Sequence, residues 1–185
     1  MEVERLYANW DIALEWAPFL LDPSIPPEGK ERRPQTSPDS PKSHLEERGE
    51  SLGIEFRRGR TFVPNTRPAL QAVEFAREHG TTEQVMDYHR CLFKAYFTDF
   101  ENLMDVDVLV RHGEAAGFEG TALREALDTG RYAQQVEQGI ADSYNRGVSA
   151  IPTFIIEDRY AVEGAQEYET FEKVMNRLGV RRRGA

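Results

Sequence analysis

The stretch GVSAIPTFIIEDRYAVEGAQ, residues 147–166, decides the fold. It carries an apolar, β-rich run at residues 154–156, polar residues at 157–159 and a second alternating run at 160–162. Two such runs separated by a short polar turn predict a β-hairpin. Apolar residues then recur at helical spacing, which predicts a final helix at about residues 166–178.

Five segments ahead of the hairpin repeat apolar residues at helical spacing, and most of them end near a glycine. They cover residues 66–78, 82–96, 106–116, 120–129 and 132–145. The middle of the chain is therefore predicted to be a block of helices.

The N-terminal residues predict a helix end followed by a strand. Apolar side chains of residues 3–10 fall at helical spacing, and DIALEWAPFLL at residues 11–21 alternates apolar and other residues until Pro18. A strand, a block of helices, a hairpin and a terminal helix together predict an α/β layered fold.

Residues 30–64 are predicted to be a flexible connection. The text KERRPQTSPDSPKSH is dense in proline, serine and charge, and nothing apolar anchors the chain between Ile25 and Leu45. A short helix is predicted within this connection, at residues 45–52, because Gly53 offers a natural stop.

Composition excludes several functions. The net charge of -9 disfavours nucleic-acid binding, and the only basic run, at 181–183, falls in a short solvated tail, residues 181–185. No apolar stretch is long enough for a membrane span and the N-terminus has no signal-peptide pattern, so we expect a soluble, cytoplasmic protein.

The single cysteine, Cys91, excludes an internal disulfide and a multi-cysteine zinc site, and the four histidines lack metal-ligand spacing. We expect no metal and no cofactor, and a core position for Cys91.

Three segments together resemble the DsbA-like branch of the thioredoxin superfamily, and within it the FrnE-type cytoplasmic branch. They are EWAPFLLDPSIPPEG at 15–29, VPNTRPALQAVEFAREHG at 63–80 and the hairpin text at 147–166. In addition, YHRCLFKAYFTD at 88–99 resembles the inserted helical subdomain of that family.

This resemblance implies a thioredoxin-like fold interrupted by a helical subdomain. The thioredoxin-like part would consist of residues 1–29 and 147–180, and the inserted subdomain of residues 65–146. In the family, the proline of a motif similar to Ala-Ile-Pro-Thr is cis and helps to hold a substrate peptide. Ile151, Pro152 and Thr153 are thus the implied binding residues for a peptide or thiol-containing substrate.

The chain departs from the family at its start. The first central strand of the sheet and the Cys-x-x-Cys motif that follows it have no counterpart here, so no catalytic residue can be carried over. As written, the chain is expected to be inactive as a thiol-disulfide oxidoreductase, and to be an N-terminally truncated form of one.

Two alternatives stay open. The chain could be a redox-inactive peptide-binding or partner-binding module, built on the Pro152 loop and a groove lined by Tyr88, Phe93, Tyr96 and Phe97. It could also be a relative of glutathione-dependent isomerases. The missing central strand would leave backbone groups unpaired, which suggests a strand-donating homodimer.

Overall fold

The structure, a computed structural model, describes residues 2–34 and 39–184 of the 185. It is a mostly helical α/β fold that divides into two compact units. The first unit comprises residues 1–21 and 139–185, and the second comprises residues 22–138. No helix among the described residues is long and apolar enough to cross a membrane.

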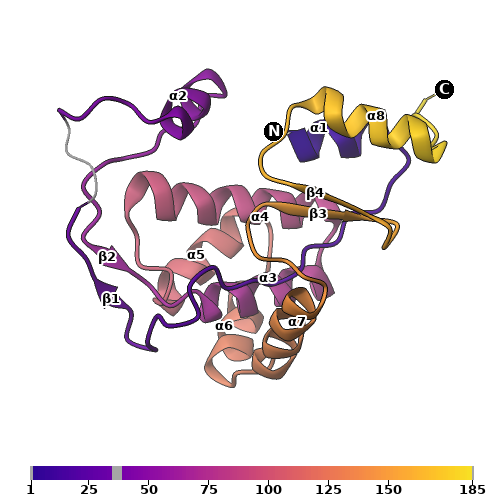
Figure 1. The fold of residues 1–185 in the computed structure, drawn as a ribbon. Helices are drawn as coiled ribbons and strands as arrows, with labels where there is room; N and C mark the ends of the chain where they lie inside the picture. Colours follow the sequence, from indigo (N-terminus) through magenta and orange to yellow (C-terminus); the bar gives the residue numbers. More distant parts are fainter. Residues whose placement is uncertain (1, 35–38, 185) are drawn as a thin grey trace. The chain divides into compact units, whose positions relative to one another are not determined.

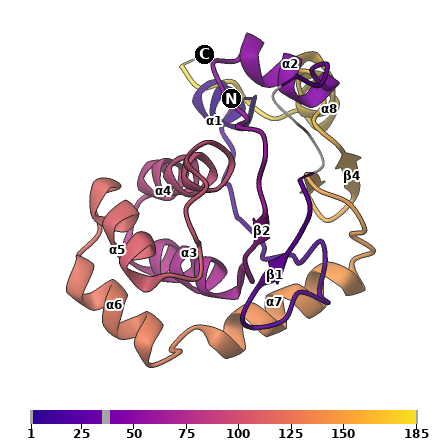
Figure 2. The same ribbon diagram turned by 90° about the vertical axis from the view of Figure 1, so that its left-hand side faces the viewer.

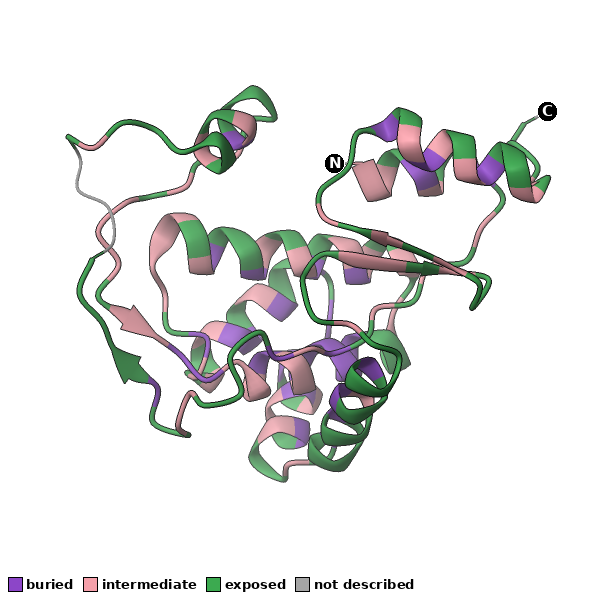
Figure 3. Ribbon diagram, in the orientation of Figure 1, coloured by how far each residue is buried: buried purple, intermediate pink, exposed green. Residues whose placement is uncertain are grey.

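The first unit is built on two helices and a hairpin. Helix α1 (Glu2–Asn9) packs beside α8 (Tyr168–Leu178), and the hairpin of β3 (Thr153–Ile156) and β4 (Tyr160–Glu163) packs against them, as Figure 1 shows. The buried residues of this core come from both ends of the chain: Leu6, Trp10, Tyr168, Phe171 and Met175. In Figure 3 the buried positions of α8 recur along the helix, as expected for an amphipathic helix.

The hairpin and the terminal helix are confirmed. Strands β3 and β4 pair antiparallel, from Thr153 opposite Glu163 to Ile156 opposite Tyr160. The turn places Glu157 and Asp158 at φ values of 53° and 49°, and two consecutive positive φ values are typical of the turns that match strand twist.

The strand predicted at residues 11–21 is wrong. The alternation is real, because Ile12, Leu14 and Trp16 are half-buried while the residues between them are exposed. However, a strand also needs a neighbour to bond with, and the only bridge of this region to another described segment joins Trp10 to Arg182. Side-chain alternation therefore set the burial pattern without giving a paired strand.

The C-terminal arginines are exposed, as expected of a solvated end, but their backbone is bonded to the end of α1. Arg181 O accepts from Asp11 N and Arg183 N donates to Asn9 O, both at 2.9 Å. The Arg183 guanidinium also donates to Trp10 O at 2.9 Å. Through residue 184 the tail is thus part of the first unit, and residue 185 lies outside the described residues.

The second unit is a bundle of helices, which Figure 2 shows from one side. Its main elements are α3 (Arg67–His79), α4 (Thr82–Lys94), η1 (Ala95–Asp99), α5 (Val106–Ala115) and α6 (Gly120–Asp128). The predicted helices are confirmed, except that the segment predicted at 82–96 leaves α-helical geometry after Lys94. Residues 95–99 form a π-helix, which closes at Phe100.

A further predicted helix, α7 (Ala133–Asn145), is also confirmed, and the boundary between the two units falls inside it. The division into a thioredoxin-like part and an inserted subdomain, with limits at residues 29, 65 and 147, stays a prediction.

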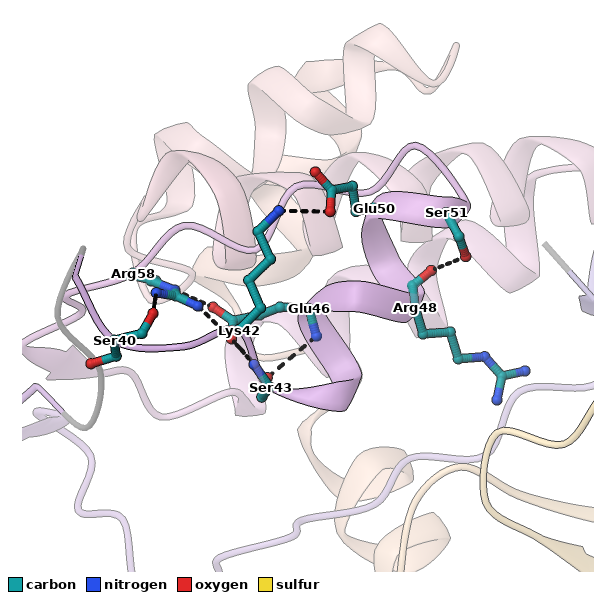
Figure 4. A network of polar contacts seen from close by, with 8 residues as sticks. All are labelled: Ser40, Lys42, Ser43, Glu46, Arg48, Glu50, Ser51 and Arg58. Carbon is teal, nitrogen blue, oxygen red and sulfur yellow. Dashed lines mark hydrogen bonds and ion pairs between the residues drawn. The ribbon is translucent and has the colours of Figure 1, made fainter.

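Residues 30–64 hold two short strands, β1 (Lys30–Glu31) and β2 (Phe62–Val63), and helix α2 (His44–Ser51), which confirms the predicted short helix. Figure 4 shows what holds α2: Ser43 and Glu46 cap it reciprocally, and Arg58 donates to Glu46 at 2.5 Å. The flexibility of this connection stays a prediction, and residues 35–38 lie outside the described residues.

Several side chains of α4 lie differently from the prediction. Tyr88 is fully buried and donates to Leu109 O at 2.8 Å, so it cannot line a groove. Phe93, by contrast, is 52% exposed. Cys91, predicted to be in the core, is half-buried. The buried side chains of α4 are those of Val85, Tyr88 and Leu92.

Candidate functional site

The residues implied by the family resemblance lie together in the first unit, where the chain enters β3. The peptide bond between Ile151 and Pro152 is cis, as expected. Two hydrogen bonds fix the loop: Thr153 Oγ1 donates to Ala150 O at 2.7 Å, and Pro152 O accepts from Gly164 N at 2.8 Å. The loop is therefore tied both to itself and to the residue that follows β4.

The outer side of this loop is open to solvent. Ile151 is 53% exposed and Pro152 is also exposed, whereas Thr153 is half-buried. The next residue, Phe154, anchors the strand, because its ring packs edge-on against Phe171 of α8 with centroids 4.8 Å apart. An exposed apolar loop thus stands on a strand that the core holds in place.

The hydrogen-bond register shows which backbone groups of β3 are free. Gly164 bonds Pro152, so in an antiparallel pair the next hydrogen-bonded positions along β3 are Phe154 and Ile156. The N–H and C=O groups of Thr153 and Ile155 consequently point away from β4. No described residue forms a backbone hydrogen bond to them from that side. We call this free side of β3, together with Ile151 and Pro152, the β3 edge.

An open strand edge beside an exposed apolar loop is suited to bind an extended peptide. It can bond the main chain of an extended peptide, while the apolar loop contacts a side chain of that peptide. Among residues 150–156, which read AIPTFII, the hydroxyl of Thr153 is the one polar side-chain group, and there is no cysteine, histidine, acidic or basic side chain.

Other candidates for chemistry lie elsewhere or are absent. Cys91 belongs to α4 of the second unit. Within residues 2–34 and 39–184, no group of three or more histidine, cysteine, aspartate or glutamate side chains could hold a metal ion.

Sequence reasoning located the loop and expected unpaired backbone groups beside the missing strand, but it did not say which positions of β3 are free. The edge follows from the register, since a shift of one residue would exchange the bonded and the free positions of β3.

Comparison with known proteins agrees with this architecture. Residues 1–176 match the model of the DSBA-like thioredoxin domain. The chain is 28% identical over 180 residues to an uncharacterized protein of Bacillus subtilis, YwbO, and the match covers 94% of this chain and 86% of that protein.

Two solved structures share the fold. A probable DsbA oxidoreductase from Streptomyces coelicolor gives a TM-score of 0.65 at 23% identity, covering 74% of this chain and 58% of that one. The DsbA of Chlamydia trachomatis gives 0.52 at 20% identity, with 64% of each chain covered. The chain thus spans less than two thirds of either solved relative. With its terminal helices, its hairpin and a family match over residues 1–176, the chain belongs to the DSBA-like thioredoxin domain family.

Proposed function

We propose that this chain is the substrate-binding part of a DsbA-like thiol-disulfide oxidoreductase of the FrnE-type branch, and that the β3 edge takes an extended peptide or a thiol-containing substrate. In this proposal the bundle of α3 to α6 is the inserted helical subdomain of that branch. The observation that carries the proposal is the pair of free backbone positions, Thr153 and Ile155, next to the exposed Ile151.

Binding and redox chemistry are separate in this proposal. Exchange of a disulfide needs one thiolate to attack and a second thiol to resolve the mixed disulfide. The 185 residues contain one cysteine, Cys91. We therefore expect the chain alone to bind substrates without oxidising or reducing them catalytically.

The proposal is tested with two proline variants that form a matched pair. Ile155→Pro removes an N–H that points away from the hairpin on the β3 side. Ala161→Pro removes the equivalent N–H on the opposite, β4 side, since Ala161 pairs with Ile155 at a position without mutual hydrogen bonds. Both changes introduce the same ring, both leave the ladder between the strands intact, and only the first blocks the β3 edge.

The measurement is fluorescence anisotropy of a short labelled peptide of alternating threonine and valine with one central cysteine. We expect Ile155→Pro to weaken binding by about tenfold, the worth of one backbone hydrogen bond plus the obstruction by the ring, and Ala161→Pro to leave it unchanged. Equal losses in the two variants would contradict the proposal. A serine version of the peptide tells whether the thiol itself is recognised, and tryptophan fluorescence checks that both variants fold.

A redox-inactive module that binds a protein partner is the second candidate, and the same open edge supports it. Pairing of two β3 edges would give a homodimer, which sizing in solution at rising protein concentration would reveal. In that case Ile155→Pro, but not Ala161→Pro, restores the monomer.

A further inference from the structure

Arg57 and Arg60 of the second unit share the ring of Phe100, and Arg32 lies close to Arg60. Arg60 lies over the rings of Tyr96 and Phe100, with its guanidinium carbon 3.7 and 4.4 Å from their centroids. Arg57 lies over the same Phe100 ring at 5.0 Å. Arg32 is close enough to disfavour the charge of Arg60, and its N–H donates to Thr61 O at 2.7 Å.

This arrangement is unusual in an acidic chain. The protein has 32 acidic and 23 basic residues, and most of its described arginines are within reach of a carboxylate. None of Arg32, Arg57 and Arg60 forms an ion pair with a described residue. Like charges repel one another, and an anion bound beside Arg32 and Arg60 would offset that repulsion.

Arg60 also has an unsatisfied donor. Its Nη2 is buried and has no hydrogen-bond partner among the described residues, and a buried donor without an acceptor costs free energy. Burial, together with the neighbouring Arg32, lowers the pKa of Arg60 below its ordinary value despite the opposing effect of Tyr96. A guanidinium carries its donors in its plane, where a carboxylate can accept from two of them at once.

A small pocket adjoins this guanidinium. It has a volume of about 90 Å³ and is lined by Gly59, Arg60, Thr61, Phe62, Phe100 and Glu101, which we call the Arg60 pocket. Phe100 sits there at φ 59°, a left-handed conformation that a bulky residue rarely adopts, where it closes the π-helix. Such a backbone persists only where its surroundings hold it, and these positions cluster at binding sites.

The one carboxylate in the lining is already engaged. Glu101 Oε2 accepts from Arg111 Nη2 and from His112 Nε2, each at 2.8 Å. Burial alone would raise the pKa of Glu101, but these hydrogen bonds outweigh it and lower the pKa, so the group is anionic. A singly charged ligand group tolerates this neighbour better than a doubly charged phosphate, and the volume suits a group of a few heavy atoms.

We propose that the Arg60 pocket binds the carboxylate group of a small ligand, with Arg60 donating to both oxygens and Arg57 adding charge. This site is independent of the β3 edge and of the family's thiol chemistry. Phe62 and Phe100 would contact the apolar part of the ligand next to its carboxylate.

The test is a titration of the whole chain with sodium acetate at constant ionic strength, replacing chloride, followed by the arginine side-chain N–H signals in NMR spectra. The Arg60 signal, identified by its loss in Arg60→Lys, should move saturably. Arg60→Lys should weaken binding at least about tenfold, read on the Arg57 signal, because lysine lacks the planar fork.

Two further variants keep the test decisive if Arg60→Lys does not fold. Arg57→Gln keeps Arg60 in place and should weaken acetate binding by about two- to fivefold, the effect of one partly screened charge. Arg90→Lys, on an exposed arginine paired with Asp87 of α4, should leave binding unchanged. The proposal is overturned if the Arg60 signal moves no more with acetate than with chloride, or if phosphate saturates the site and acetate does not.

Discussion

Removal of one hydroxyl from Tyr168 should weaken the first unit by about 2 kcal/mol. In Tyr168→Phe the ring stays, and with it the stacking of Arg5 at 3.8 Å. What is lost is the oxygen that accepts from Trp10 Nε1 and from Asn9 Nδ2, both at 3.1 Å. The change therefore isolates a polar link between residues at opposite ends of the chain.

The magnitude follows from the burial of the two donors. Trp10 is 1% exposed, so its N–H cannot turn to water, and a buried donor without an acceptor costs about 1–3 kcal/mol. Asn9 is half-buried, and water can replace most of its bond, which leaves roughly 0–1 kcal/mol. The Trp10 donor accounts for most of the loss, so the expected cost is about 2 kcal/mol.

The assay is urea unfolding followed by tryptophan fluorescence. Trp10 and Trp16 both belong to the first unit, so the signal reports that unit, and Trp16 remains as a probe when Trp10 is replaced. In a Trp10→Phe background no buried donor is left, and Tyr168→Phe should then cost less than about 1 kcal/mol. An equal cost in both backgrounds, or a cost below about 0.5 kcal/mol in the wild type, would refute the reasoning.

Two further predictions concern buried and paired carboxylates of the second unit. Glu74 is 2% exposed and accepts hydrogen bonds from Arg77 at 2.8 Å and from Gln135 at 2.5 Å. Glu74→Ala should therefore lower the free energy of unfolding by about 2 kcal/mol, measured by urea unfolding followed by circular dichroism. An unchanged urea midpoint would count against this prediction. Hydrogen bonds lower the pKa of Glu46 from 4.5 to about 2, and the bond from Arg58 has a larger effect than those from Ser43. The ionised carboxylate of Glu46 therefore stabilises α2 fully above pH 4.5, and this stabilisation is lost as the pH falls through about 2. A carboxyl NMR titration should show this pKa, and Arg58→Gln should raise it toward 4.5; a pKa near 4.5 in the wild type would contradict it.

Much of the fold could be predicted from the sequence because its helices are amphipathic and end at glycines or turns. The hairpin was predictable for a similar reason, since its strands are apolar and its turn is polar. The segment at 11–21 shows the limit of such patterns: alternation reports which side chains face the core, whereas a strand exists only where another strand bonds with it. Pairing is a property of two segments, and a pattern describes one.

The candidate sites were predictable to different degrees. The loop at Pro152 could be located from the family resemblance, but the free positions of β3 depend on the register with β4. No sequence pattern predicted the Arg60 pocket, because Arg32, Arg60 and Phe100 are far apart in the sequence and come together only in the folded chain. The prediction that Tyr88 lines a groove was wrong because an aromatic residue suits a groove and a core equally well. The hydroxyl of Tyr88 donates to Leu109 O in the core of the second unit.

The most direct test of the β3 edge is amide hydrogen exchange, measured with and without the threonine–valine peptide. In the free chain, the amides of Phe154 and Ile156 should exchange slowly because they bond β4, and those of Thr153 and Ile155 should exchange fast. We predict that saturating peptide slows exchange at Thr153 and Ile155. Peptide binding that leaves these two amides fast would contradict the account, since the peptide would then bind elsewhere.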